Sequence, residues 1–360
     1  METGQSLSER IREWARALGF SGARVTALYS GGYRAAGARL TRWIEAGYAG
    51  EMHYMTRSHS LRLDPCQLLP DVRSVISVTL DYWPEADLRP AMSALADPGR
   101  AYISRYALGR DYHRIIRRKL QSLAERIARE SAAPCHYRVF SDSAPVLEVA
   151  YAAESGLGWR GKNTLLLSRK GSFSFLGEIY STLDLPSDFP QTAHCGSCEK
   201  CVHACPTGAI IAPYTVDARL CISYLTIEYA GSIPEKLRPL MGNRIYGCDD
   251  CQLICPWNRR AAEGNSAFMA RQGLEKAELA DLMAWEEADF LSRLEGSPIR
   301  RIGYERWLRN LAVALGNALS AGADHPAIRA ALLARAAHPS VLVREHVAWA
   351  LAQTEKKTRP

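Results

Sequence analysis

The sequence Cys195-Gly-Ser-Cys-Glu-Lys-Cys-Val-His-Ala-Cys-Pro206 contains four cysteines followed by a proline, and it decides how the rest of this chain is interpreted. Its spacing, C-x2-C-x2-C-x3-C-P, is that of the bacterial run that binds four-iron clusters. Three closely spaced thiolates hold one face of a cluster, and the fourth turns away to ligate another cluster. The stretch therefore predicts a ferredoxin-like module with two clusters.

A second group of cysteines completes the ligand count. Cys248-x2-Cys251-x3-Cys255-Pro256 is one ligand short of the full run, and Cys221 supplies the missing thiolate. The crossover of the fourth ligand divides these eight cysteines between two [4Fe-4S] clusters. The first cluster is expected to bind Cys195, Cys198, Cys201 and Cys255, and the second Cys205, Cys221, Cys248 and Cys251.

A pair of structural zinc sites is the alternative, because paired C-x2-C motifs also bind zinc. Zinc ribbons do not require the four-cysteine run or its proline, so the spacing favours iron and sulfur. Eight of the ten cysteines lie between Cys195 and Cys255, which favours metal ligation over disulfides in a cytoplasmic protein. The two outliers, Cys66 and Cys135, are expected to be buried thiols without a chemical role.

The composition bounds the rest of the chain. Its 360 residues are 47% hydrophobic and 23% charged, which excludes collagen-like, low-complexity and wholly disordered proteins. No apolar run approaches the roughly 18 residues that cross a bilayer, and residues 1–10 lack the layout of a secretion signal. We expect a soluble, cytoplasmic protein. The net charge of +7 is compatible with a polyanionic partner.

The residues before the cysteines mix helix and strand signals. Residues 11–18 and 111–129 are expected to form helices, the second with an apolar stripe that leaves its arginines outside. Residues 72–80 are rich in β-branched side chains and predict a buried strand. Two further strands are expected at 164–168 and 172–184, joined by a turn at Lys170-Gly171. This interleaving favours a layered α/β (α+β) domain over residues 1–188.

The residues after Trp257 change to an Ala/Leu/Arg-rich helical composition. Leu308, Leu311, Leu315 and Leu319 keep helical spacing, as do Val343, Val347 and Leu351 farther on. Pro339 before the second stripe and an internal Arg are typical of HEAT-like repeats. We expect the ferredoxin-like module over 189–262 and a HEAT-like α-helical domain over 263–360, which as a self-capped repeat favours a monomer.

Two clusters form an electron path and need an acceptor. No G-x-G-x-x-G follows a predicted strand and no P-loop occurs, so neither a nicotinamide nor a nucleotide acceptor is supported. No Asp-x-His-x-x-Gly occurs either, which excludes the usual lower-ligand motif of cobalamin proteins with a protein histidine. General motifs therefore leave the acceptor open.

Several motifs together resemble the epoxyqueuosine reductase family. These are Phe140-Ser-Asp-Ser-Ala-Pro145, the stretch Ala153-Glu-Ser-Gly-Leu-Gly-Trp-Arg-Gly-Lys-Asn163, Gly109-Arg-Asp-Tyr-His113, Tyr246-Gly-Cys-Asp-Asp-Cys251 and the double-cluster cysteines. The resemblance implies a corrinoid-binding N-terminal domain, cobalamin as cofactor, and reduction of the epoxide of epoxyqueuosine to queuosine at the wobble position of tRNA. The electron donor is not implied. A soluble reductive dehalogenase-like enzyme is the second reading, and a non-catalytic RNA-binding module is the third.

The resemblance also implies roles for individual residues. Asp142 matches the proposed proton donor, for which a raised pKa beside an apolar corrin face would be suitable; without the resemblance, a turn Asp before Pro145 is the simpler reading. Arg62, Tyr106, Asp142, Lys162, Asn163, Ser223 and Asp249 fall where the family binds cobalamin. Ser223 and Asp249 adjoin cluster ligands, so they could instead hydrogen-bond only the cluster loop.

Two groups of basic residues are candidates for contact with tRNA. Seven basic residues and one acid lie between Arg100 and Lys119, and the part from Arg110 to Lys119 is expected to form one face of a helix. Arg300, Arg301, Arg306 and Arg309 form the second group. Such side chains contact phosphates and position a nucleic acid without reading its sequence.

Overall fold

The computed structural model describes residues 6–83, 87–261, 263–323 and 326–355. Part of the N-terminal stretch used above to judge secretion lies outside the described residues. At the centre of the N-terminal part is a four-stranded antiparallel sheet in the order β1-β2-β7-β4. Its strands are β1 (Gly22–Ala27), β2 (Ser74–Asp81), β7 (Ser174–Ser181) and β4 (Tyr137–Phe140).

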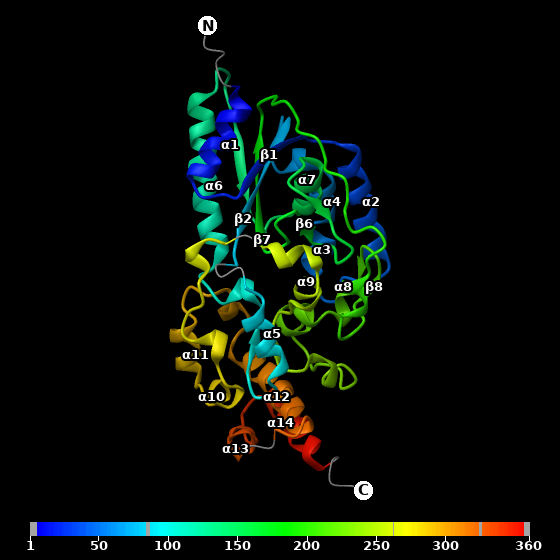
Figure 1. Cartoon of the computed structure of the whole chain (residues 1–360), viewed down its shortest axis with the longest axis vertical. Helices are drawn as coiled ribbons and strands as arrows, with labels where there is room; N and C mark the ends of the chain where they lie inside the picture. The colour runs from blue at the N-terminus through cyan, green and yellow to red at the C-terminus, as the bar shows by residue number, and fades with distance from the viewer. Residues whose placement is uncertain (1–5, 84–86, 262, 324–325, 356–360) are drawn as a thin grey trace.

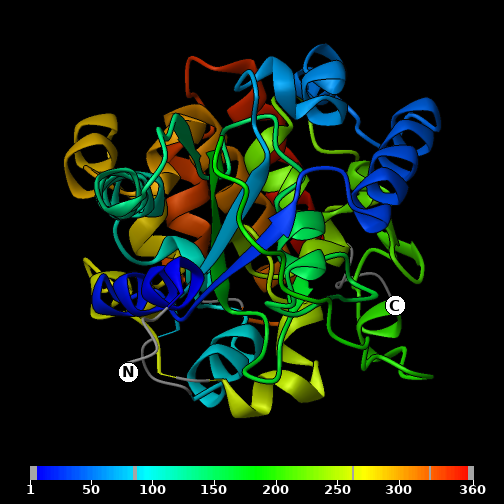
Figure 2. The same ribbon diagram turned by 90° about the horizontal axis from the view of Figure 1, so that it is seen from above.

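Helices cover both faces of this sheet (Figure 1), and Figure 2 shows α6 and α2 on opposite sides of it. The helices of the N-terminal part are α1 (Leu7–Ala17), α2 (Gly31–Glu45), α3 (His53–Arg57), α4 (His59–Leu63), α5 (Arg89–Ala96), α6 (Tyr112–Glu130) and α7 (Glu148–Glu154). α1 and α6 pack on one face and α7 on the other. The expected layered domain is thus present, with an antiparallel sheet.

The side chains of β2 and β7 explain why the sheet is covered twice. Alternate residues of a strand point to opposite faces, and Ile76 and Ile179 join the core beneath α6 while Val75 and Tyr180 join the core beneath α7. The predicted strand 72–80 and helix 111–129 agree closely with β2 and α6. The helix expected at 11–18 begins earlier, because Ser6 and Glu9 form a capping box.

The other predicted strands are shorter than expected. Residues 164–168 contribute only β6 (Leu166–Leu167), which pairs with β5 (Trp159–Arg160) and not with β7. The turn at Lys170-Gly171 is confirmed by paired backbone hydrogen bonds between Ser168 and Gly171. A further two-residue strand, β3 (Tyr102–Ile103), runs parallel to β10 (Arg244–Tyr246).

The cysteine region consists of short elements. They are α8 (Lys200–His203), β8 (Ile210–Ala212), β9 (Thr215–Val216), a π-helix η4 (Tyr224–Glu228), β10 and α9 (Asp250–Leu253). α8 and α9 each carry the middle cysteine of a C-x2-C-x3-C motif and pack against each other. The repeated motif therefore forms a repeated structure.

The described residues after 263 contain helices and no named strand. The helices are α10 (Leu279–Met283), α11 (Glu287–Arg293), α12 (Tyr304–Ser320), α13 (Pro326–Ala334) and α14 (Val341–Glu355). The leucine stripe of α12 is buried, as are Val343 and Val347 of α14. This core also includes Ile103, Ile227 and Tyr246, so the helices share their core with the segments before them. None of the described helices is long and apolar enough to cross a membrane.

Candidate active site

The electrostatic neighbours of the cysteine thiols are compatible with the two predicted ligand groups, which stay a prediction. Cys201 interacts electrostatically with Cys195, Cys198 and Cys255. Cys251 does so with Cys221 and Cys205, and Cys248 with Cys251. Cys201 and Cys251 also influence each other, so the two groups adjoin. Within the described part of the chain, no group of three or more His, Cys, Asp or Glu side chains is placed so that it could hold a metal ion.

Burial controls the protonation of these thiols. It raises the pKa of Cys221, Cys248 and Cys251, and neighbouring negative groups add to the effect at Cys248 and Cys251. Bound iron would supply the positive charge that holds such groups as thiolates. The donor set is all sulfur and fits iron–sulfur clusters.

Asp142 lies in the loop between β4 and α7, at the rim of the N-terminal sheet. Its backbone has a φ of 54°, a left-handed conformation that Asp tolerates better than most residues. Its Oδ2 accepts hydrogen bonds from the hydroxyl of Tyr112 and from Nε2 of His113, the latter at 3.0 Å. Its own N–H donates to Oε1 of Glu148 at 2.6 Å. Two contacts from α6 thus hold this carboxylate, and one from α7 holds its backbone.

The proton at this site is held by His113. Burial opposes its charge, but hydrogen bonds to Asp111 and Asp142 outweigh that cost and raise the pKa of His113 to about 9. Burial tends to raise the pKa of Asp142, but the hydrogen bonds from His113 and Tyr112, with the charge of Arg301, lower it. The expected raised pKa of Asp142 is therefore not met in this structure, where a carboxylate faces an imidazolium.

Arg62 and Tyr106 lie near residues that contact Asp142, Arg62 near Glu148 and Tyr106 against Tyr112. Arg62 is 8% exposed, and its Nη1 donates to the carbonyl oxygens of Tyr54 and Ser58. Tyr106 packs edge-on against Tyr112 with ring centroids 6.0 Å apart. Both residues therefore belong to the surroundings of Asp142.

Lys162 and Asn163 lie against the cysteine module instead. The Lys162 side chain is 9% exposed, with an ion pair of 3.6 Å to Glu199. The Asn163 amide donates weakly, at 3.5 Å, to the carbonyl oxygen of Cys251. These contacts connect the N-terminal domain with both cysteine motifs.

Ser223 and Asp249 hydrogen-bond protein groups of the cluster region. Ser223 hydrogen-bonds Cys221. Asp249 is 1% exposed and accepts hydrogen bonds from Tyr102, Ser104 and the N–H of Arg105. These contacts favour the structural alternative for both residues. They also tie β3, which leads to Tyr106, to the second cysteine motif.

The two basic groups lie on adjacent segments. Arg110, Arg114, Arg117 and Arg118 are exposed at and along the start of α6. The N–H of Asp111 donates to the carbonyl oxygen of Gly296, shortly before exposed Arg300 and Arg301. Asp142 faces both segments, through His113 on α6 and through the charge of Arg301.

The expectation that Arg309 lies on this surface is wrong. Its side chain is fully buried and donates to the carbonyl oxygens of Leu225, Tyr229 and Gly231. Arg306 is half-buried and donates to the carbonyl oxygens of Ile302 and Ile227. Both arginines stabilise the π-helix region, because carbonyls freed from regular helical pairing need other donors.

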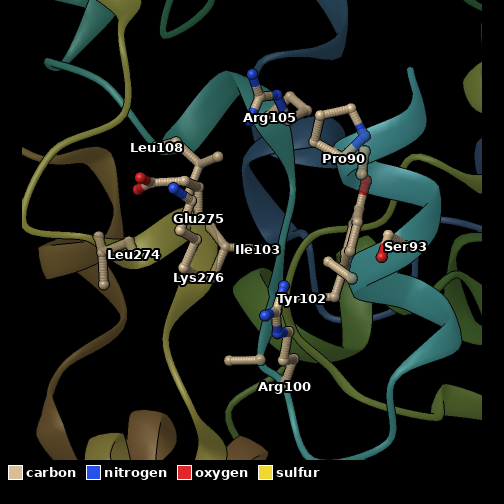
Figure 3. A pocket seen from close by; sticks show the side chains of 13 residues that line it. Pro90, Ser93, Arg100, Tyr102, Ile103, Arg105, Leu108, Leu274, Glu275 and Lys276 are labelled. Atoms are coloured by element: carbon tan, nitrogen blue, oxygen red, sulfur yellow. The ribbon is translucent and has the colours of Figure 1, made fainter. Parts of the chain in front are cut away.

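Sequence reasoning missed the groups that set the charge of Asp142. His113 follows Asp111, which caps α6, and an Asp before a helix is a recognisable signal. Glu178 has no local signal, since only the sheet topology brings it beneath the Asp142 loop, whereas Glu148 lies six residues after Asp142 at the start of α7. A cavity of about 310 Å³ lies elsewhere, between α5, β3 and residues 274–276 (Figure 3). Tyr102 and Arg105 line it, but Asp142 and the cysteines do not.

Fold and site together define a protein in which an iron–sulfur double-cluster module is joined to an α/β domain that carries a hydrogen-bonded Asp142–His113 pair. The family model described as "4Fe-4S double cluster binding domain" matches residues 194–258, and the model "Epoxyqueuosine reductase QueG, DUF1730" matches residues 62–143. The chain is 55% identical to epoxyqueuosine reductase of Pseudomonas aeruginosa, over 96% of this chain and 94% of that relative. The Escherichia coli enzyme is 49% identical, over 96% and 89%. The chain belongs to the epoxyqueuosine reductase family.

Solved structures of this family have the same fold. An epoxyqueuosine reductase crystallised with an epoxyqueuosine-modified stem loop of tyrosine tRNA is 26% identical, with a TM-score of 0.85, and the match covers 97% of this chain and 90% of that one. The Bacillus subtilis enzyme, solved with an aspartate-bearing catalytic loop swung out of its active site, is 27% identical with a TM-score of 0.83. Its match covers 97% of this chain and 90% of that chain.

Proposed function

We propose that this chain reduces the epoxide of epoxyqueuosine in tRNA to the cyclopentene of queuosine. The observation that carries the proposal is the position of Asp142, hydrogen-bonded to a protonated His113 where the start of α6 meets the Arg301 segment. Converting an epoxide to an alkene and water consumes two electrons and two protons. The cysteine module would supply the electrons, and His113 with Asp142 would supply a proton to the departing oxygen.

The eight cysteines are proposed to hold two [4Fe-4S] clusters in the groups described above. Clusters of this kind reach the low potentials that a corrinoid acceptor needs.

Cobalamin is the proposed acceptor, and the buried donors near Asp142 and the cysteines suit it. Arg62 has no carboxylate within ion-pair distance among the described residues, and the Asn163 amide makes only a long hydrogen bond. Such donors would bind the amide and phosphate oxygens of a corrinoid, with Lys162 beside them and the Tyr106 ring as a wall. When bound, the cobalt centre supplies electrons to the substrate. Ser223 and Asp249 would act through the cluster loops.

The protein's own residues would handle the proton and the RNA. His113 shares its proton with Asp142, which would deliver it to the epoxide oxygen while Tyr112 orients the carboxylate.

Arg114, Arg117 and Arg118 would contact the tRNA backbone, and a wobble base splayed from the anticodon would enter beside Arg301. A tRNA substrate is consistent with a cytoplasmic enzyme. We propose that the loop 141–147 corresponds to the catalytic loop that moves in the B. subtilis enzyme.

Nucleoside mass spectrometry tests the proposal. The protein is incubated anaerobically with epoxyqueuosine-bearing tRNA, cobalamin and a strong reductant. We expect a cobalamin-dependent loss of one oxygen mass from the modified base. No change with both clusters intact would favour the dehalogenase-like alternative, and tight tRNA binding without cobalamin uptake would favour an RNA-binding module.

The same assay tests Asp142. Asp142→Asn is expected to lower turnover by about 10²- to 10⁴-fold, the usual contribution of a general acid, with iron content and tRNA binding retained. Asp71→Asn is the control, since Asp71 is an exposed aspartate with a similar φ of 58°. Unchanged turnover in Asp142→Asn would reject the acid role.

A further inference from the structure

Two carboxyl groups lie beneath the Asp142 loop, with Glu148 half-buried and Glu178 fully buried, and the proposed reaction uses neither. Glu148 is the first residue of α7. Glu178 lies on the central strand β7, opposite Ser77 of β2 and Phe140 of β4, and is 0% exposed. Charged residues are rarely buried without partners, so this pair requires an explanation.

Glu178 is a buried carboxyl group without a hydrogen-bond partner among the described residues, since both of its oxygens lack one. Burial, and then the negative charge of Glu148, raise the pKa of Glu178 well above its ordinary value. Glu178 is therefore the neutral member of the pair, and Glu148 is the member that ionises.

Glu148 in turn contacts the backbone of Asp142. Its Oε1 accepts the Asp142 N–H at 2.6 Å. Asp142 has the left-handed conformation that non-glycine residues adopt only where the surroundings enforce it. The hydrogen bonds from Tyr112 and His113 hold the side chain of Asp142, whereas Glu148 holds its main chain.

We infer that Glu148 is a positioning residue, which fixes the Asp142 loop in the conformation seen here, and that Glu178 supports Glu148 from the sheet. The inference rests on the proposed acid role of Asp142. It explains why a carboxyl group lies on the central strand, where an apolar side chain would otherwise be expected.

The charge of Glu148 gives this role a pH dependence. Burial, and then the charge of Asp142, raise the pKa of Glu148 to about 7, and burial raises that of Glu178 well above its ordinary value. An ionised carboxylate accepts an N–H more strongly than a neutral one. The loop is therefore held more firmly as pH rises through about 7. The titratable groups that face Glu148 are Asp142, His113, Tyr112, Arg62, Glu178 and Tyr180.

The experiment compares three variants by turnover, its pH profile and hydrogen exchange of a peptide spanning 141–147. Glu148→Ala is expected to lower kcat by about 100-fold, as misplacement of a reacting group does, with little change in KM and with faster exchange of this peptide. Glu148→Gln keeps an acceptor without charge, so it should restore part of kcat and lose the acid limb near pH 7. Glu178→Gln mimics the neutral carboxyl group and should behave like wild type.

Iron content verifies folding in each variant, and Glu154→Ala is the matched control. Glu154 lies on the same helix and accepts the N–H of Gly32. Unchanged exchange and turnover in Glu148→Ala would overturn the inference, as would faster exchange with unchanged turnover, or an inactive Glu178→Gln. If Asp142→Asn keeps full turnover, the proposed acid role fails instead, while exchange still reports whether Glu148 holds the loop.

Discussion

The cysteine module and the Asp142 site contribute different halves of one proposed reaction, and they are built differently. The module takes all eight of its cysteines from residues 195–255, with the middle cysteines on two short helices that pack together. The Asp142 site takes side chains from α6, the β4–α7 loop, α7 and the segment before α12. The first depends on local spacing, whereas the second depends on packing between distant segments, which also sets its charge.

The largest effect is expected from removing the one cysteine that lies outside both local motifs. Cys221→Ser is expected to lose about half of the bound iron, because one of two four-iron clusters loses a ligand, and to abolish turnover because the electron path is interrupted. Iron analysis of anaerobically purified protein and the nucleoside assay measure the two effects.

Cys135→Ser is the control for this variant, since Cys135 lies apart from the module near Ser181. It should retain both the iron and the turnover. Full iron retention in Cys221→Ser would refute the proposed ligand set.

The same difference explains what the sequence could predict. The cysteine groups follow from spacing, and β2 and α6 follow from their periodicity. The charge of Asp142 could not be predicted, because His113 and Arg301 approach it only in the folded chain. Asp142 lies 29 residues from His113 in sequence. The same local sequence is compatible with a carboxylate beside an apolar face and with one beside an imidazolium. The first environment raises the pKa of the carboxyl group and the second lowers it.

Arg309 shows the limit of reading charge from composition. In the sequence it belongs to an arginine-rich group, which indicated a solvated or RNA-binding face. In the structure α12 is buried on nearly every side, and Arg309 and Asn310 donate to carbonyl oxygens of the π-helix region and of Ile245. A π-helix has no reliable sequence signal. The need for buried donors such as Arg309 and Asn310 beside it therefore could not be predicted from the sequence.

A milder change tests whether packing controls the proton at the Asp142 site. His113 carries its proton below its raised pKa and loses it as pH rises through about 9. His113→Gln keeps a hydrogen-bond donor to Asp142 but removes this titration. We expect turnover at pH 7 to fall by about tenfold. The alkaline limb near pH 9 should move to lower pH, because Asp142 is then the remaining acid and loses its proton at lower pH than His113 does, even though loss of the imidazolium raises the pKa of Asp142.

The pH profile of single-turnover rates measures this change. His59→Gln is the matched control, because His59 is hydrogen-bonded to Thr41 on α2, away from the site. An alkaline limb that persists unchanged in His113→Gln would show that another group holds the proton.

The smallest expected effect concerns the surface that would bring tRNA to the Asp142 site. Arg114, Arg117 and Arg118 are exposed on α6, and replacing all three with alanine should remove up to three phosphate contacts. We expect tRNA affinity to fall by about tenfold near physiological salt, and the slope of log K against log salt to shrink by about two, since each lost contact removes about 0.7–0.9. Bound substrate should still be reduced at the wild-type rate, because no catalytic group is touched.

Arg129→Ala, at the far end of the same helix, should leave both affinity and slope unchanged. If the triple variant binds tRNA with the wild-type slope, α6 does not face the RNA, and the exposed arginines before α12 become the principal candidates.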